Sequence, residues 1–113
     1  MDCLFCKISA NEIPATVVFE NERVVAFEDI HPQAPTHVQI IPRKHIATTL
    51  DLGPEDRSVV GEIFEVAAQI ARDRGVADDG FRLVVNTNTA AGQTVYHLHL
   101  HLIGGRSLGW PPG

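Results

Sequence analysis

The sequence lacks a long hydrophobic run, an excess of basic residues and any stretch of low complexity. None of its apolar runs approaches the ~20 residues that span a bilayer. The first seven residues contain neither the basic region nor the apolar stretch typical of a signal peptide. We therefore expect no membrane segment and a cytoplasmic location. A formal net charge of −5 argues against a nucleic-acid-binding surface, but a small anion could still bind to local backbone dipoles.

Cysteine is also scarce, and its two copies, Cys3 and Cys6, stand in a C-x-x-C spacing. In a reducing cytoplasm this spacing favours a metal or redox pair over a structural disulfide. The 113 residues are 44% hydrophobic and 20% charged, a balance typical of globular proteins. This length and composition predict one domain spanning residues 1–113.

Apolar periodicity predicts an α+β fold, with hairpins and one dominant helix around a mainly antiparallel sheet of about five strands. A short helix is expected at residues 3–10, and prolines at positions 32 and 35 indicate a loop. The long helix begins near Pro54, continues for about five turns and ends at Gly75. It should pack on one face of the sheet. The expected strands are residues 16–19, 23–28, 37–41, 81–86 and 95–103.

The last predicted strand contains three of the six histidines, at positions 97, 99 and 101. Side chains alternate along a strand, so the histidines share one face and the intervening leucines face the core. Neighbouring histidines would lie ~6–7 Å apart at Cα and the outer two ~13 Å apart, by the strand rise. One metal ion could therefore bind two of them but hardly all three. A solvated polar face and a metal-binding ladder are the alternative interpretations.

Histidine can act near pH 7 as a nitrogen nucleophile, an acid or a base. A phosphorus–imidazole bond is labile, so a histidine that attacks phosphorus forms an intermediate that water can break. The central residue, His99, is best placed as the nucleophile, with His97 and His101 on either side to orient it or to bind phosphate oxygens.

The loop before this strand contains small and polar residues from Thr89 to Val95. Gly92 lets backbone N–H groups approach an anion, and Gln93 and Thr94 add side-chain donors. A plain hairpin turn would explain the same composition. Its position next to His99 favours the interpretation as a phosphate loop.

The run at 97–103 resembles the signature of the histidine-triad (HIT) family of nucleotide-binding proteins. Further matching segments are residues 13–15, 26–37, 41–46, 92–97, 104–106 and 110–113. The last two resemble the Hint branch of the family. The resemblance covers nearly the whole chain, and it implies a HIT-like fold and a homodimer with one continuous sheet.

The resemblance also implies a hydrolase that cleaves phosphoramidates of purine nucleoside monophosphates through a nucleotidyl intermediate on His99. His37 matches an additional active-site histidine that assists through a hydrogen-bonded relay, and His101 matches the triad position near the phosphate. Asp29 would accept hydrogen bonds from the ribose hydroxyls. A dinucleoside polyphosphate hydrolase, a nucleotide-binding interaction protein and a zinc-storing module are the alternatives. The tail with Trp110 favours the phosphoramidase, because in Hint-like proteins it reaches the partner's active site.

Carried over by position, the base pocket would be lined by six apolar residues that could equally belong to the core. They are Leu4, Phe5, Ile8, Ile13, Phe27 and Ile30. The groups around the phosphate would be Asn86, Gly92, Gln93, Thr94 and the Val95 backbone. Two residues depart from the family pattern. Thr94 replaces a serine and keeps its hydroxyl, whereas Gln39 replaces an apolar residue of the pocket.

The cysteine pair, with His45 and His97, matches the zinc ligands of a subset of bacterial HIT proteins. Two thiolates and two imidazoles can form a tetrahedral structural site that ties the N-terminus to the body of the domain. His97 would then bind zinc, and the chemistry would belong to His99, His101 and His37. The alternative is a pair of reduced cysteines, one of them packed as a small apolar residue. His31 is expected only to face solvent.

Overall fold

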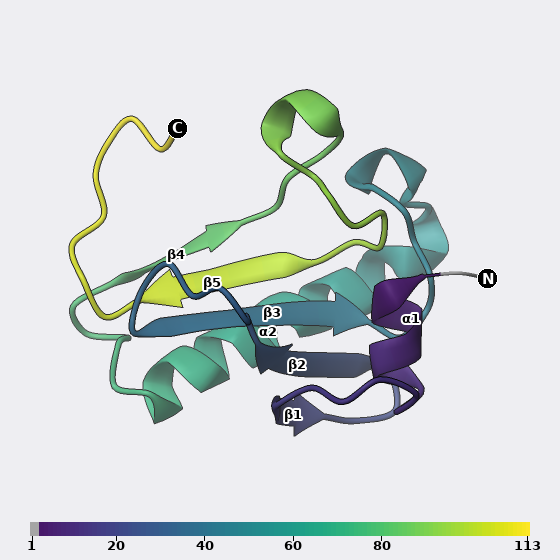
Figure 1. Ribbon diagram of the computed structural model, residues 1–113, viewed down its shortest axis with the longest axis horizontal. Helices are drawn as coiled ribbons and strands as arrows, with labels where there is room; N and C mark the ends of the chain where they lie inside the picture. The colour runs from purple at the N-terminus through teal and green to yellow at the C-terminus, as the bar shows by residue number, and fades with distance from the viewer. Residues whose placement is uncertain (1–2) are drawn as a thin grey trace.

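A computed structural model describes residues 3–113 and shows a five-stranded antiparallel sheet with one long and one short helix (Figure 1). In the sheet the strands are ordered β1-β2-β3-β5-β4. This architecture confirms the predicted α+β fold. The elements are α1 (Leu4–Ser9), β1 (Val17–Glu20), β2 (Val24–Glu28), β3 (Thr36–Pro42), α2 (Arg57–Asp73), β4 (Phe81–Val84) and β5 (Leu100–Gly104). Single 3-10 turns lie at Thr49–Asp51 (η1), Pro54–Asp56 (η2) and Thr89–Ala91 (η3).

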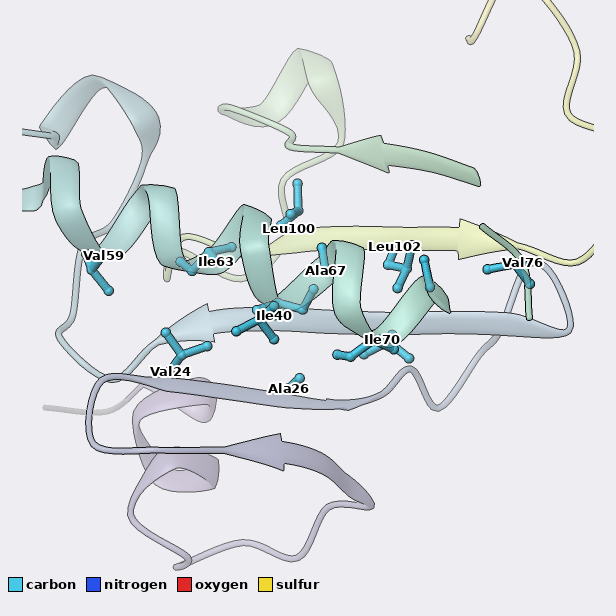
Figure 2. Packing of buried hydrophobic residues seen from close by; sticks show 13 residues of the cluster. Val24, Ala26, Ile40, Val59, Ile63, Ala67, Ile70, Val76, Leu100 and Leu102 are labelled. Atoms are coloured by element: carbon cyan, nitrogen blue, oxygen red, sulfur yellow. The ribbon is translucent and has the colours of Figure 1, made fainter. Parts of the chain in front are cut away.

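Helix α2 covers one face of the sheet, as its apolar spacing predicts. Its side chains Ile63, Ala67 and Ile70 pack against Ile40 of β3 and Leu102 of β5 (Figure 2). Both strand residues are fully buried. The leucines between the histidines therefore do face the core, which leaves the other face of β5 for chemistry.

Helix α1 packs against the opposite face of the sheet. Its Phe5 and Ile8 join Val25, Phe27 and Ile41 in a second, smaller cluster. In the antiparallel ladders Gln39 pairs with both Phe27 and His101, so the three share a face. The face of the sheet that carries Phe27, Gln39 and His101 is therefore only partly covered, by one short helix at one end (Figure 1).

The predicted strand 95–103 is wrong in its first half, because β5 begins only at Leu100. The neighbouring strand β3 ends at Pro42, which has no N–H to extend a ladder. Beyond that point the N–H of Leu98 donates to the carbonyl of Ile46 (2.6 Å) instead. The histidine run consequently starts as irregular chain and enters the sheet before His101.

The C-terminal residues 105–113 form neither helix nor strand, and one hydrogen bond ties them to β4. The Nη2 group of Arg82 donates to the carbonyl of Gly109 (2.7 Å), and Trp110 beside it is 84% exposed. Across residues 3–113, no helix is long and apolar enough to cross a membrane.

Candidate active site

His99 is buried and carries its lone pair on Nε2. Its Nδ1 lies 2.8 Å from the backbone carbonyl of His97, which can only accept, so Nδ1 holds the proton. Burial lowers the pKa of His99, an effect that the bond to this carbonyl partly opposes. The ring is therefore a neutral imidazole with a nucleophilic Nε2, as the chemistry predicted for the central histidine requires.

His37 and His101 form a hydrogen-bonded pair across β3 and β5. Nδ1 of His37 accepts from the backbone N–H of Gln33 (3.0 Å), so the proton of neutral His37 lies on Nε2. That Nε2–H donates to Nδ1 of His101, 2.9 Å away. The proton of His101 is thereby placed on its Nε2, and its ring centroid lies 5.0 Å from that of His99.

His101 is held neutral more strongly than His99. Burial lowers the pKa of His101 to about 4, and the neighbouring imidazoles of His99 and His37 act in the same direction. At neutral pH its Nε2–H is therefore a donor without a positive charge. Such a group can hydrogen-bond to a phosphate oxygen while Nδ1 stays an acceptor for His37.

This shift predicts that acid destabilises the fold through His101. The unfolded histidine titrates near 6.5 and the folded one near 4. Between these values the unfolded state binds more protons, so the free energy of unfolding falls as the pH drops from 6.5 to 4. The expected loss is up to about 3 kcal/mol. Urea denaturation at pH 7 and pH 4.5 should show a weaker pH dependence for His101→Gln than for the wild type.

Replacement of the exposed His31 by glutamine is the matched control for this measurement. It should leave the wild-type pH dependence unchanged. Equal pH dependence of the wild type and His101→Gln would contradict the assignment of this effect to His101.

An open cavity of about 700 Å³ lies beside these histidines, between α1, β2 and the segment before β1. The structure brings all six predicted base-pocket residues into its wall, together with Asp29, Gln39, Thr94 and Val95. The Phe5 ring stands edge-on to Phe27 at 5.3 Å and to His99 at 5.1 Å, between centroids. The apolar wall is therefore continuous with the proposed nucleophile. Ile30 is an exception to burial, because it is 86% exposed.

Asp29 is bound through both of its carboxylate oxygens. Oδ1 accepts from the N–H of His31 (2.8 Å), and Oδ2 accepts from Nε2 of Gln39 (2.9 Å). Oδ2 also lies 3.4 Å from Nε2 of His37. Because a carboxylate only accepts, the hydrogen bond between Asp29 and Gln39 fixes the orientation of the Gln39 amide, with Nε2 toward Asp29. Among residues 3–113, Oε1 of Gln39 is the one buried side-chain oxygen or nitrogen with no hydrogen-bond partner.

The polar loop before the histidine run is braced by Gln93. Its Nε2 donates to the carbonyls of Ala47 (2.9 Å) and Val95 (3.2 Å), and its Oε1 accepts from the N–H of Asn88 (2.8 Å). Both amide protons are thus used, so this side chain supports the loop and offers a phosphate no free donor. Gly92 has a φ of 89° at the end of η3, a conformation that glycine adopts easily.

The other predicted phosphate residues are less enclosed. Thr94 is exposed at the cavity, and Asn86 is half-buried just beyond β4. Trp110 does not line the cavity of its own chain. Their assignment to the site stays a prediction.

Four side chains meet at the N-terminal end of the site in a cluster that fits a metal ion. These are Cys3, Cys6, His45 and His97. The Sγ atoms of Cys3 and Cys6 lie 3.4 and 3.5 Å from Nδ1 of His97, and Sγ of Cys6 lies 3.3 Å from Nδ1 of His45. Ideal zinc–sulfur and zinc–nitrogen bonds in a tetrahedron place such atoms about 3.5 Å apart. The spacing therefore matches the donor set that the sequence predicts.

The protonation of this cluster also suits a metal. His97 donates through Nε2 to the carbonyl of Pro42 (2.7 Å), which leaves the Nδ1 lone pair facing the thiols. Burial lowers the pKa of His97, so its ring is neutral. Burial and the neighbouring Cys3 raise the pKa of Cys6 to about 11, so a metal would have to displace the proton of that thiol. With both ring nitrogens used, His97 can assist His99 only through its backbone carbonyl.

A second group, Asp29, His37 and His101, also has ligand atoms within 4.8 Å of one another. Here, however, Nε2 of His37 carries a proton, because its Nδ1 accepts from Gln33. A protonated nitrogen cannot coordinate a metal. This group is therefore arranged for hydrogen bonding.

Comparison with known proteins agrees with this architecture. The sequence profile of the HIT domain matches residues 10–108. The purine nucleoside phosphoramidase of Escherichia coli strain K12 is 49% identical over 108 residues, which cover 96% of this chain and 91% of that protein. The 14 kDa zinc-binding protein of Zea mays is 46% identical over 112 residues, covering 97% and 87%.

A solved structure shows the same fold. The HIT family hydrolase from Legionella pneumophila Philadelphia 1 superposes with a TM-score of 0.98 at 54% identity, covering 99% of this chain and all of that one. The fold and the sequence profile of this chain thus occur together in a known family. This chain belongs to the HIT family.

Proposed function

We propose that this protein is a hydrolase that cleaves purine nucleoside phosphoramidates through a nucleotidyl intermediate on His99. The observation that carries the proposal is the neutral ring of His99 next to an apolar cavity. The bond from its Nδ1–H to the His97 carbonyl leaves the lone pair on Nε2. The phosphoramidase relative from E. coli supports the substrate class. The E. coli and Legionella relatives both support hydrolysis.

In the proposed complex the purine base occupies the 700 Å³ cavity and stacks among its apolar residues. The ribose hydroxyls donate to Asp29, which lines this cavity. The phosphate lies at the other end, near His99 and the loop at residues 92–95. His101 donates a hydrogen bond from Nε2 to a phosphate oxygen.

The reaction then proceeds in two halves. Nε2 of His99 attacks phosphorus, and the P–N bond breaks with its electron pair leaving on nitrogen, which takes up one proton from solvent and departs as the amine. The imidazolium so formed keeps Nδ1–H on the His97 carbonyl. Water then attacks phosphorus, the P–Nε2 electron pair returns to His99, and one proton returns to solvent.

We propose further that the Cys3, Cys6, His45 and His97 cluster binds a structural zinc ion. The interatomic spacing and the zinc-binding relative from Zea mays support this assignment. The metal would link α1, which carries part of the base pocket, to the segment that contains His97 and His99. The chemical steps need no metal in this scheme.

We also propose a homodimer formed along β4. This strand is an edge of the sheet. Val85, directly after it, and Phe64 of α2 are 37% and 45% exposed. Both line an apolar groove of about 160 Å³ together with Leu98. A second copy would cover these side chains and place the exposed Trp110 near the partner's site. Light scattering should give twice the 12.3 kDa chain mass, whereas a monomer would contradict this part of the proposal.

Turnover of two substrates tests the proposed function. Adenosine 5′-phosphoramidate and a dinucleoside polyphosphate are incubated separately with the protein, and AMP release is followed by chromatography. We expect the phosphoramidate to be cleaved faster. Preferential cleavage of the polyphosphate would instead indicate the related hydrolase, and tight AMP binding without cleavage of either would indicate a binding protein.

The location of the protein is a separate proposal. Two free thiols arranged as metal ligands suit a reducing compartment, the cytoplasm. Cell fractionation tests this expectation, and recovery with the membrane or secreted fraction would contradict it.

A further inference from the structure

The proton on His37 is positioned by a backbone group outside the histidine run. The N–H of Gln33 donates to Nδ1 of His37 across 3.0 Å, which leaves Nε2–H to donate to His101. If Gln33 moved away, neutral His37 could place its proton on Nδ1 instead. Nε2 would then be an acceptor, and the proton of His101 would no longer be held on the side facing the phosphate.

Gln33 lies in a loop with little remaining freedom. Pro32 and Pro35 have fixed φ angles, and each restricts the residue before it. The loop is closed by a hydrogen bond from the N–H of Asp29 to the carbonyl of His37 (3.0 Å). Because prolines donate no backbone N–H, Gln33 and Ala34 are the only backbone donors from residue 32 to residue 35. Backbone rotation inside the loop is therefore concentrated at Gln33, because Pro35 also restricts Ala34.

Arg106 holds Gln33 on its other side. Its Nε donates to the Gln33 carbonyl (2.9 Å), and its Nη1 donates to the carbonyl of Ser107 (3.0 Å). Gly105, just before it, has a φ of 96°, and a Cβ there would lie 3.0 Å from Cβ of Pro35. The turn after β5 therefore packs closely on the proline loop and brings the guanidinium to the Gln33 carbonyl.

We propose that Arg106 is a positioning residue for the reaction, which acts through Gln33 to fix the proton of His37 on Nε2. The guanidinium holds the Gln33 carbonyl, Gln33 holds Nδ1 of His37, and His37 holds Nδ1 of His101. Arg106 is exposed and touches no group of the cavity wall. Its effect on turnover rests on the proposed function, but its effect on the His37 proton does not.

Two measurements on Arg106→Ala test this proposal. The ¹⁵N shifts of the imidazole nitrogens in labelled protein identify the protonated nitrogen. The wild type should show His37 protonated at Nε2, whereas Arg106→Ala should show Nδ1 and Nε2 shifts that approach each other. The kcat for adenosine 5′-phosphoramidate should fall about tenfold, because small displacements of catalytic groups are costly. KM should stay within about twofold, since the cavity wall is unchanged.

Two further variants control the experiment. Arg106→Lys keeps a cationic donor and should recover part of both the kcat and the His37 tautomer. Arg72→Ala removes an exposed arginine from the last turn of α2 and should change neither. Loss of folded protein would lower the apparent kcat with KM unchanged, so kcat is calculated per folded protein, with the folded fraction measured by circular dichroism.

The outcomes separate this proposal from the proposed function. An unchanged His37 tautomer in Arg106→Ala overturns the positioning role, whatever the turnover. A changed tautomer with an unaltered kcat overturns the role in the reaction. Absence of turnover in the wild type would overturn the proposed function, and the ¹⁵N shifts would still decide whether Arg106 controls His37.

Discussion

Replacement of His99 by alanine is expected to lower kcat for adenosine 5′-phosphoramidate by at least about 10,000-fold, the scale of loss when a covalent nucleophile is removed. Neither neighbouring imidazole of the histidine run can take over its role. Both nitrogens of His97 are used by the cysteines and the Pro42 carbonyl. His101 is bound to His37 through Nδ1, and its Nε2 carries a proton. Initial rates of AMP release measure the effect.

A covalent adduct provides the second readout. Wild-type protein mixed with substrate and quenched within the first turnover should gain the mass of one nucleotidyl group, and peptide mapping should place it on His99. His99→Ala should gain none while retaining AMP affinity within about tenfold. Arg72→Ala, which removes an exposed arginine from the last turn of α2, is the control and should behave as wild type. Equal cleavage by His99→Ala and wild type would refute the mechanism.

The sequence predicts those parts of the fold that depend on local periodicity. The apolar spacing from Val59 to Ala71 allows only one buried face for a helix, and α2 buries it. The start of this helix is less certain from sequence, because Pro54 opens a separate 3-10 turn and α2 begins at Arg57. The helix itself is predicted correctly, and its first residue depends on capping contacts.

The histidine run shows why strand boundaries are harder to predict. Alternating histidines and leucines have the same pattern in a paired strand and in an extended segment without partners. The difference is set by Pro42 on the neighbouring strand and by Ile46, whose carbonyl accepts from Leu98. Both residues lie more than 50 positions before Leu98 in the sequence. Such distant contacts leave no mark in a local window.

The site is predictable where it depends on side-chain types and hidden where it depends on backbone groups. The resemblance brings forward Asp29, Phe5 and Ile13, which the structure gathers at one cavity. It does not show that the Gln93 amide donates both of its protons to backbone carbonyls. Nor does it show that Gln33 sets the tautomer of His37, because any residue except proline at that position supplies an N–H. Gln39 is different, because the sequence already marks it as a polar residue at a position where the family is apolar.

Removal of one thiol from the proposed zinc cluster is the other change with a large expected effect. Cys6→Ser is the better variant, because Cys3 also accepts the Cys6 N–H (3.3 Å) as the cap of α1. The wild type should bind one zinc ion per chain, measured by elemental analysis after dialysis, and the variant should bind none. Free zinc at 1,000 times its Kd should stabilise the wild type by up to about 4 kcal/mol, and should leave Cys6→Ser unchanged.

Chelation of the wild type distinguishes loss of metal from loss of packing. Cys6 is only half-buried, so serine there should cost little by itself, and chelated wild type should unfold at the same urea concentration as Cys6→Ser. His45→Asn removes a ligand on another segment and should give the same result. Because His97 contributes a ring nitrogen to the cluster and a carbonyl to His99, kcat should fall in these variants, though far less than in His99→Ala. A wild-type protein that binds no zinc, or a Cys6→Ser variant stabilised by zinc as strongly as the wild type, would rule out this site.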